Sequence, residues 1–127
     1  ASDVYKRQCK HCGNIITTVK ESGVPVSCCG EPMQPLVAGS VDAAKEKHVP
    51  VVTVNGSDVS VAVGSVTHPM TPEHFIEWVA IETSNSTQIR YLSIDEPPTA
   101  SFHLTDGETL QTVYAYCNLH GLWKSTL

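Results

Sequence analysis

The stretch Tyr116-Cys117-Asn118-Leu119-His120-Gly121-Leu122-Trp123 places a histidine three residues after a cysteine, near the end of the chain. Cys117 is also the only cysteine outside the N-terminal third of the sequence. A thiolate and an imidazole at this spacing can converge on one point across a tight turn, and both groups bind transition metals. Two donors make only half of a metal site, so the stretch predicts further ligands elsewhere in the chain.

Three further histidines stand in short motifs that indicate the missing ligands. The motifs are Glu46-Lys47-His48-Val49-Pro50, Thr67-His68-Pro69-Met70 and Pro72-Glu73-His74. Any one of these histidines taken alone is more simply a loop residue that satisfies a hydrogen bond. Together with Cys117 and His120 they favour one metal bound by four nitrogens and one sulfur. This donor set exceeds what tetrahedral zinc takes and allows an axial sulfur with a free sixth position, which favours redox iron.

A second cluster of donors lies near the N-terminus, in Cys9-Lys10-His11-Cys12-Gly13 and Cys28-Cys29-Gly30-Glu31-Pro32, with fifteen residues between Cys12 and Cys28. The spacing is typical of a four-cysteine site of the zinc-ribbon or rubredoxin kind, and it does not distinguish iron from zinc. A disulfide-linked or purely structural knuckle is the alternative. Adjacent cysteines can reach one ion only from a bent backbone. We expect the turns at Gly13 and Gly30 to aim backbone N–H groups at the sulfurs, and His11 to be exposed and not a ligand.

Length and composition limit the possible classes of protein. The chain has 127 residues, of which 41% are hydrophobic, which is enough for a packed core. The net charge of −5 argues against nucleic acid as a partner, and an anionic substrate would need a local positive site. Residues 1–10 show no signal-peptide pattern and no segment reaches membrane-spanning length, so we expect a cytoplasmic protein without membrane contact. In that reducing compartment five cysteines favour metal ligation over a disulfide framework.

The sequence predicts two domains, 1–37 and 38–127, because turn-forming residues lie around the boundary: Pro32, Pro35 and Gly39-Ser40. Beyond the boundary, short runs rich in Val, Ile, Thr, Tyr and Phe recur about every ten residues, which predicts an all-β antiparallel sandwich or barrel. Residues 42–47 allow one helical turn, and residues 15–19 of the first domain favour a strand. The expected strands of the second domain are 50–54, 59–63, 75–83, 88–94, 99–104 and 110–117, of which 75–83 is apolar on both faces and therefore interior.

These motifs resemble those of desulfoferrodoxins, the two-iron class of superoxide reductase, over essentially the whole chain. The four N-terminal cysteines with Gly30-Glu31-Pro32-Met33 are similar to the desulforedoxin-like domain of that family. The histidine motifs and Cys117-Asn118-Leu119-His120-Gly121-Leu122-Trp123 are similar to its second domain. The resemblance implies a desulforedoxin/rubredoxin-like metal domain followed by an immunoglobulin-like β-sandwich, and a homodimer. It also implies one-electron reduction of superoxide to hydrogen peroxide, with a rubredoxin-type electron donor.

The resemblance also implies roles for individual residues. One iron would be bound by Cys9, Cys12, Cys28 and Cys29 as an Fe(Cys)4 centre. A second iron would form an Fe(His)4Cys centre, with His48, His68, His74 and His120 in the equatorial plane and Cys117 as the axial ligand. Lys47 would be the cation beside the open position, and Glu46 the carboxylate that occupies this position in the resting ferric state. His103, Trp78 and Trp123 are expected to be structural. Two other functions stay open: an electron-transfer or iron-binding protein without superoxide chemistry, and a structural zinc protein.

Overall fold

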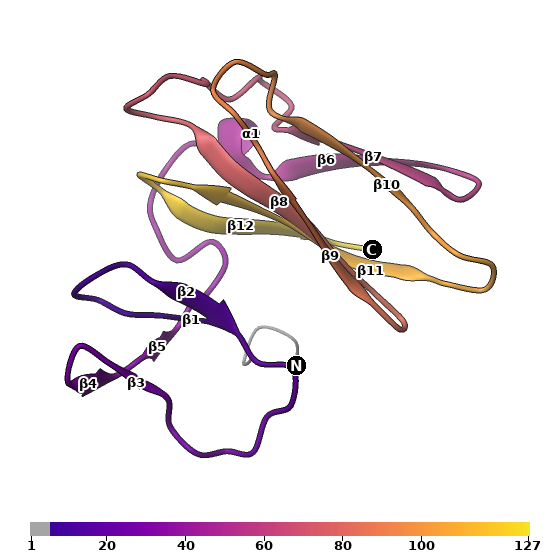
Figure 1. The fold of residues 1–127 in the computed structure, drawn as a ribbon. Helices are drawn as coiled ribbons and strands as arrows, with labels where there is room; N and C mark the ends of the chain where they lie inside the picture. The colour runs from indigo at the N-terminus through magenta and orange to yellow at the C-terminus, as the bar shows by residue number, and fades with distance from the viewer. Residues whose placement is uncertain (1–5) are drawn as a thin grey trace. The chain divides into compact units, whose positions relative to one another are not determined.

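The structure is a computed structural model that describes residues 6–127 (Figure 1). The chain divides into two compact units, Ala1–Ala38 and Gly39–Leu127. The first five residues of the predicted N-terminal domain lie outside the described residues. Within residues 6–127, no helix is long and apolar enough to cross a membrane.

The first unit is built from five short strands. A three-stranded antiparallel sheet has the order β2-β1-β5, with β1 at Lys6–Gln8, β2 at Ile15–Thr17 and β5 at Gln34–Pro35. Strands β3 (Ser27–Cys28) and β4 (Glu31–Pro32) form a two-stranded hairpin that carries the second cysteine pair. The strand predicted over residues 15–19 ends at Thr17, and Val19 is fully exposed. Among the described residues of this unit, the buried apolar side chains are only Cys9, Met33 and Leu36.

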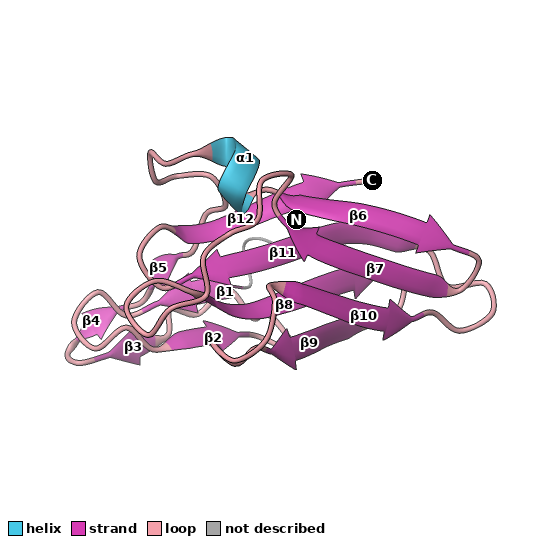
Figure 2. Cartoon of the chain, turned by 90° about the horizontal axis from the view of Figure 1, so that it is seen from above, coloured by secondary structure: helices cyan, strands magenta, loops and turns pink. Residues whose placement is uncertain are grey.

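The second unit is an antiparallel β-sandwich of two sheets. One sheet has the order β10-β7-β6 and the other β12-β11-β8-β9. Figure 2 shows these strands as layers, with the helical turn α1 (Lys45–His48) in cyan. Their bounds are β6 Pro50–Asn55, β7 Asp58–Val63, β8 Ile76–Thr83, β9 Thr87–Tyr91, β10 Thr99–His103, β11 Leu110–Cys117 and β12 Gly121–Thr126.

All six predicted strands of this unit exist, with ends that differ by a few residues, and the all-β class is confirmed. Strand β8 lies between β11 and β9, as its two apolar faces predict. The helical turn predicted over residues 42–47 is found at Lys45–His48. Strand β12 was not among the predicted strands, because its first residues follow the ligand motif directly and lack an alternating pattern of their own. It pairs with β11 along its whole length.

The core of the sandwich explains why the two sheets pack. In β7 the alternate residues Val59, Val61 and Val63 are almost fully buried, while Ser60 and Ala62 between them are exposed. Facing side chains from β8 and β11 join the same apolar cluster, including Val79 and Val113. Burial of each such side chain contributes about 1.5–3 kcal/mol relative to exposure. The sandwich therefore has a core of its own that does not depend on a metal ion.

Candidate metal centres

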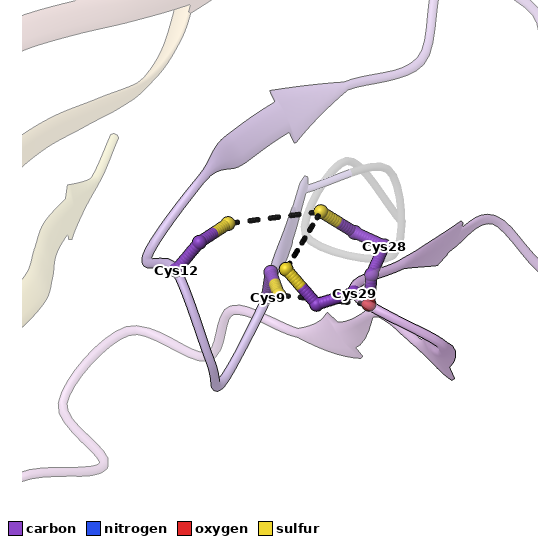
Figure 3. A group of neighbouring side chains, drawn as sticks. All are labelled: Cys9, Cys12, Cys28 and Cys29. Carbon is purple, nitrogen blue, oxygen red and sulfur yellow. Dashed lines mark hydrogen bonds between the residues drawn. The ribbon is translucent and has the colours of Figure 1, made fainter.

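Four cysteines of the first unit gather their sulfur atoms at one point (Figure 3). The Cys12 and Cys28 sulfurs are 3.7 Å apart, and the Cys28 and Cys29 sulfurs are 4.0 Å apart. None of the four forms a disulfide, which requires about 2.05 Å between sulfurs. A tetrahedral metal with metal–sulfur bonds of about 2.3 Å separates its sulfurs by about 3.8 Å. The donor set therefore fits a four-thiolate metal ion.

The backbone around these cysteines is bent as the adjacent pair requires. Cys29 has a positive φ of 53°, the one non-glycine residue in residues 6–127 with this conformation. The Gly13 N–H closes the first cysteine turn by donating to the Cys9 carbonyl at 2.9 Å and does not itself face a sulfur. The N–H groups of Cys12 and His11 instead face the Cys9 sulfur and lower the pKa of Cys9 to about 6. His11 is exposed, as predicted, and lies 3.1 Å from Glu31.

The four thiols cannot all ionise by themselves. Hydrogen bonding with Cys12, and then with Cys9 and Cys28, raises the pKa of Cys29 to about 12. The pKa of Cys28 is raised as well, first by its contact with Cys12. A bound cation offsets this repulsion, since thiolates are the form that binds metals. The crowding of the sulfurs thus fits a site that is completed by a metal.

Four imidazole rings of the second unit form a square. Neighbouring ring centroids are 4.7 Å apart for His48 and His68, 4.6 Å for His68 and His74, 5.0 Å for His74 and His120, and 4.9 Å for His48 and His120. The diagonal between His48 and His74 is 6.3 Å. Neighbouring rings are steeply inclined, at 76° to 90°. Four donors from α1, the β7–β8 loop and the β11–β12 turn therefore surround one point.

Hydrogen bonds select which nitrogen of each ring faces this point. Nδ1 of His48 lies 2.7 Å from the Ala44 carbonyl, and Nδ1 of His68 lies 2.7 Å from the Pro69 carbonyl. Both Nδ1 atoms must donate a proton to these carbonyls, which leaves each Nε2 with a lone pair directed inward. Nε2 of His74 is buried and has no partner within residues 6–127. His120 differs, because its Nδ1 faces Nε2 of His48 at 3.2 Å.

The square has the dimensions of a metal site. Nε2 of His68 is also 3.2 Å from Nε2 of His48. Two nitrogens at this separation and at right angles about a common centre are each about 2.3 Å from it, close to ordinary metal–imidazole bonds of about 2.0–2.1 Å. The Cys117 sulfur lies 3.9 Å from Nδ1 of His120, and the donor atoms of His48, His74, Cys117 and His120 all lie within 4.8 Å of one another. The orphaned His74 nitrogen and this spacing fit a bound metal.

Burial keeps the imidazoles in their metal-binding form. Desolvation lowers the pKa of His48 and His74, and it lowers the pKa of His68 to about 4. All three rings are therefore neutral at neutral pH. Burial raises the pKa of Cys117, although the backbone N–H groups of Leu119 and His120 oppose this effect by facing the sulfur. A nearby cation is needed to hold Cys117 as a thiolate, which a metal ion bound by these neutral rings would supply.

Residues that the sequence did not single out hold the ligand loops together. The Asn118 side chain accepts a hydrogen bond from the Phe75 N–H at 2.9 Å and donates one to the Glu73 carbonyl at 3.0 Å. It thereby joins the loop of His74 to the turn between Cys117 and His120. The sequence signal for this role is an asparagine in the turn between two ligands, because its side chain can both donate and accept hydrogen bonds.

A second such residue is Thr71, whose hydroxyl accepts a hydrogen bond from the His74 N–H at 3.1 Å. Trp123 forms part of the wall of the site. Its ring lies 5.0 Å from that of His48, and its Nε1–H donates to the His120 carbonyl at 3.0 Å. Trp78 stacks on Tyr116 at 5.4 Å. His103 is exposed and lies 3.0 Å from Asp58, with neither residue among the clustered metal donors.

Glu46 and Lys47 occupy the two positions before the His48 ligand, on the exposed side of α1. The positive charge of Lys47 contributes to the lowered pKa of His48 and of His74, after desolvation and the charge of His120. Lys47 therefore stands near two corners of the square. Neither side chain forms part of the cluster of metal donors.

The fold and the two donor sets define a class of protein with two mononuclear metal centres, a four-thiolate centre in a small β unit and a nitrogen-rich centre at one end of a β-sandwich. Comparison with known families supports this class and narrows it. Residues 40–126 match the family model described as Desulfoferrodoxin, and residues 1–36 match Desulfoferrodoxin, N-terminal domain.

Relatives and solved structures agree with these matches. The chain is 47% identical to a desulfoferrodoxin from Clostridium acetobutylicum, over 93% of this chain and 92% of the relative. It is 40% identical to a desulfoferrodoxin from Nitratidesulfovibrio vulgaris, over 97% and 94%. The superoxide reductase from Treponema pallidum superposes with a TM-score of 0.77 at 43% identity, over 90% of this chain and 93% of that chain. The one-iron superoxide reductase from Giardia intestinalis gives 0.58 at 33% identity, over 65% and 98%.

The chain therefore belongs to the desulfoferrodoxin family. Its two donor sets agree with the two iron centres of that family, four thiolates in one unit and four imidazoles with one thiolate in the other.

Proposed function

We propose that this protein is a superoxide reductase that reduces superoxide to hydrogen peroxide by one electron. The observation that carries the proposal is the square of four imidazoles around one point, with a buried cysteine sulfur beside it and exposed charged residues next to it. The superoxide reductases from Treponema pallidum and Giardia intestinalis share this fold and support the assignment.

The proposal assigns each iron to its ligands. Residues 1–37 form the desulforedoxin-like domain, and residues 38–127 form the immunoglobulin-like superoxide reductase domain. The first iron is held by Cys9, Cys12, Cys28 and Cys29. The second iron would be held by His48, His68, His74, His120 and Cys117.

The protein side chains prepare the second centre for an anionic substrate. Ferrous iron, when bound there, supplies the single electron that superoxide takes up. The two carbonyls that accept Nδ1–H bonds fix the tautomers of His48 and His68, so these rings add no charge of their own. Four neutral imidazoles and one thiolate leave a net charge of plus one at a ferrous centre, which gives this acidic chain a local positive target.

Lys47 and Glu46 act at the exposed side of this centre in our proposal. Lys47 adds a second positive charge, attracts superoxide through solvent and holds it beside the centre. Glu46 would supply a carboxylate for the open position of the oxidised centre. Replacing Glu46 with alanine is expected to change the spectrum of the ferric centre and to leave the reduction of superoxide nearly intact.

We further propose a rubredoxin-type protein as the electron donor, a homodimer as the assembly and the cytoplasm as the location. These proposals rest on the resemblance to two-iron desulfoferrodoxins. Pull-down with rubredoxin and sedimentation at several concentrations test the first two, and fractionation of source cells tests the third.

The central test is to mix the fully reduced protein anaerobically with a known amount of superoxide, while the optical spectrum, peroxide and oxygen are measured. If all superoxide consumed appears as peroxide and a ferric band develops, the protein is a reductase. If half of the superoxide returns as oxygen, the protein is a dismutase and the proposal is wrong. If the ferrous protein does not react, it is an electron-transfer or iron-binding protein, and a colourless protein containing zinc would indicate a structural role.

A further inference from the structure

One turn of the second unit holds the backbone of Glu46 and Lys47. The Glu46 carbonyl oxygen accepts hydrogen bonds from the Val66 N–H at 2.8 Å and from the Ser65 hydroxyl at 3.2 Å. Gly64 is buried against the same peptide. A Cβ atom at Gly64 would lie 2.5 Å from the Glu46 carbonyl oxygen and 2.9 Å from the carbonyl carbon of Lys47. The peptide thus rests directly on a residue that has no side chain.

The helical turn α1 does not fix the position of Lys47 by itself. It has four residues and no side-chain cap at Ala44, and so short a helix is unstable alone. Its exposed Glu46 and Lys47 side chains form no hydrogen bond or ion pair with other residues in the range 6–127. The backbone is held at the Glu46 carbonyl on one side of Lys47 and at the buried His48 ring on the other. Lys47 therefore takes its position from these two anchors, together with the hydrogen bond that its own N–H donates to the Ala44 carbonyl at 3.2 Å.

The turn that provides the first anchor is itself fixed to the core and to the metal site. Val63, the last residue of β7, is 1% exposed, and its N–H donates to the Pro98 carbonyl at 2.9 Å. The His68 N–H donates to the Val63 carbonyl at 2.9 Å. The same short segment consequently presents the His68 ligand and supports the peptide that precedes the His48 ligand.

We propose that Gly64, assisted by Ser65, is a positioning residue that sets where Lys47 stands beside the metal centre. The inference deepens the proposed function and rests on the role given there to Lys47. Carbon atoms pack favourably at about 3.5–4.0 Å, so a methyl group at position 64 displaces the Glu46–Lys47 peptide by roughly 1 Å. The peptide moves outward, because the buried β7 end behind Gly64 cannot yield. The Lys47 charge then moves away from the centre while the five metal donors remain.

The experiment compares Gly64→Ala, Ser65→Ala, Lys47→Ala and the double variant Gly64→Ala/Lys47→Ala. The rate of reaction of each ferrous protein with superoxide is measured over a range of ionic strengths. Hydrogen exchange of the Val66 amide is measured separately in the zinc-loaded proteins. Gly56→Ala is the control for an added methyl group that meets no neighbour, because a Cβ atom at Gly56 has nothing within 4 Å; Gly56 differs from Gly64 in having a positive φ, of 61°.

We expect Gly64→Ala to bind iron in the second centre with an unchanged spectrum and to react roughly threefold to tenfold more slowly, with a weaker dependence on salt. The Val66 amide should exchange faster, since its acceptor has moved. The double variant should react no more slowly than Lys47→Ala, because both changes remove the same effect. Ser65→Ala should show a smaller loss of the same kind, and Gly56→Ala should show none.

Wild-type rate and salt dependence in iron-loaded Gly64→Ala would overturn the inference. The inference would also be overturned if the double variant reacted more slowly than Lys47→Ala by the same factor that separates Gly64→Ala from the wild type, because Gly64 would then act independently of Lys47. If Gly64→Ala does not bind iron, Ser65→Ala decides, and an unchanged salt dependence there overturns the inference. If Lys47→Ala itself reacts like the wild type, the proposed role of Lys47 fails and the inference fails with it. Hydrogen exchange of the Val66 amide in Gly64→Ala distinguishes this failure from a failure of the packing argument. Faster exchange shows that the Glu46–Lys47 peptide is displaced even though Lys47 has no role in the reaction.

Discussion

The two metal centres of this chain are built in opposite ways. In the first unit, two pairs of cysteines supply all four donors, and the buried apolar side chains among its described residues are only Cys9, Met33 and Leu36. In the second unit, five donors come from three separate places at one end of a sandwich that has its own apolar core: His48, His74, Cys117 and His120, with the His68 ring against His48 and His74. The metal organises the first unit, whereas the fold of the second unit organises the metal site.

The electrostatics of the two donor sets follow the same division. Crowded thiols in the first unit oppose one another's ionisation, as the pKa of about 12 for Cys29 indicates. Buried imidazoles in the second unit are neutral, as the pKa of about 4 for His68 indicates, so they lie together without a cation. Removing the metals should therefore affect the two units very differently.

Metal removal is the change with the largest expected effect. Chelation at neutral pH should unfold the first unit, since a structural metal bound by thiolates contributes about 10–16 kcal/mol in small domains. The second unit should stay folded because its valine-rich core remains. Amide spectra by NMR check this, with the signals of residues 6–38 losing dispersion and those of residues 39–127 keeping it. Retained dispersion in the first unit, or its loss in both, would contradict the comparison.

The next largest effect is expected from Asn118→Ala. The variant loses both side-chain hydrogen bonds that join the two ligand loops, at 2.9 Å and 3.0 Å, and keeps the one that the Asn118 N–H donates to the Phe75 carbonyl at 3.2 Å. Loss of residues that orient ligands typically weakens metal binding by about 10–100-fold. Competition with a chromophoric chelator measures this affinity for the second centre, while that of the four-cysteine centre should be unchanged.

Asn55→Ala serves as the control for this variant, because Asn55 ends β6 at an exposed turn away from the ligands. Asn118→Asp should lose less affinity, since it keeps the acceptor for the Phe75 N–H and lacks only the donor to the Glu73 carbonyl. If all three variants bound the metal of the second centre with equal affinity, the sandwich would position its ligand loops without the side-chain hydrogen bonds of Asn118.

The exposed charge of Lys47 is expected to affect only the second centre, because only that centre attracts a substrate in our proposal. We expect Lys47→Ala to lower the rate of the ferrous protein with superoxide about tenfold and to weaken its dependence on ionic strength. Lys45→Ala is a matched control, because it removes an equal charge from an exposed residue of the same helical turn. Stopped-flow measurements at several salt concentrations separate the two variants. The same loss in both would show that net charge, and not the place of Lys47, determines the rate.

The two centres also differ in how far the sequence predicts them. The four-cysteine site follows from local spacing, because Cys9 with Cys12 and Cys28 with Cys29 each lie on one short bend. The alternation of Val59, Val61 and Val63 likewise predicts a half-buried strand without knowledge of its partners. The five donors of the second centre are far apart in the chain, so their residue types suggest one metal but only the fold shows that they meet.

Contacts that arise only from tertiary packing were not predictable. Nothing in the local sequence indicates that Gly64 lies under the peptide of Glu46, eighteen positions earlier, or that Asn118 reaches the loop of His74. The hydrogen bond made by Gly13 could not be predicted for a related reason. Its N–H closes the cysteine turn on a carbonyl, and which acceptor lies in reach depends on the exact bend of the backbone.

The smallest effect is expected from a change at the end of the sandwich that is remote from the metal donors. Glu108 precedes β11 at the end remote from Cys117, and its carboxylate accepts hydrogen bonds from Ser86, Thr83 and Thr105. These bonds, that of Ser86 first, lower the pKa of Glu108 to about 2 from its ordinary value of 4.5. The folded state therefore prefers the ionised form. Its stabilising effect is fully present above pH 4.5 and is lost as the pH falls towards 2.

Glu108→Gln should accordingly lower the urea midpoint of the metal-free protein at pH 7 and have little effect near pH 2. Fluorescence reports this midpoint for the second unit alone, since both tryptophans, Trp78 and Trp123, lie there. Other carboxyl groups titrate in both proteins, so the difference between the two midpoints isolates Glu108. A difference that is constant from pH 7 to pH 2 would mean that the shape of the side chain, and not its charge, closes this end of the sandwich. A difference that depends on added metal would contradict the view that the second unit is stable without its metal ion.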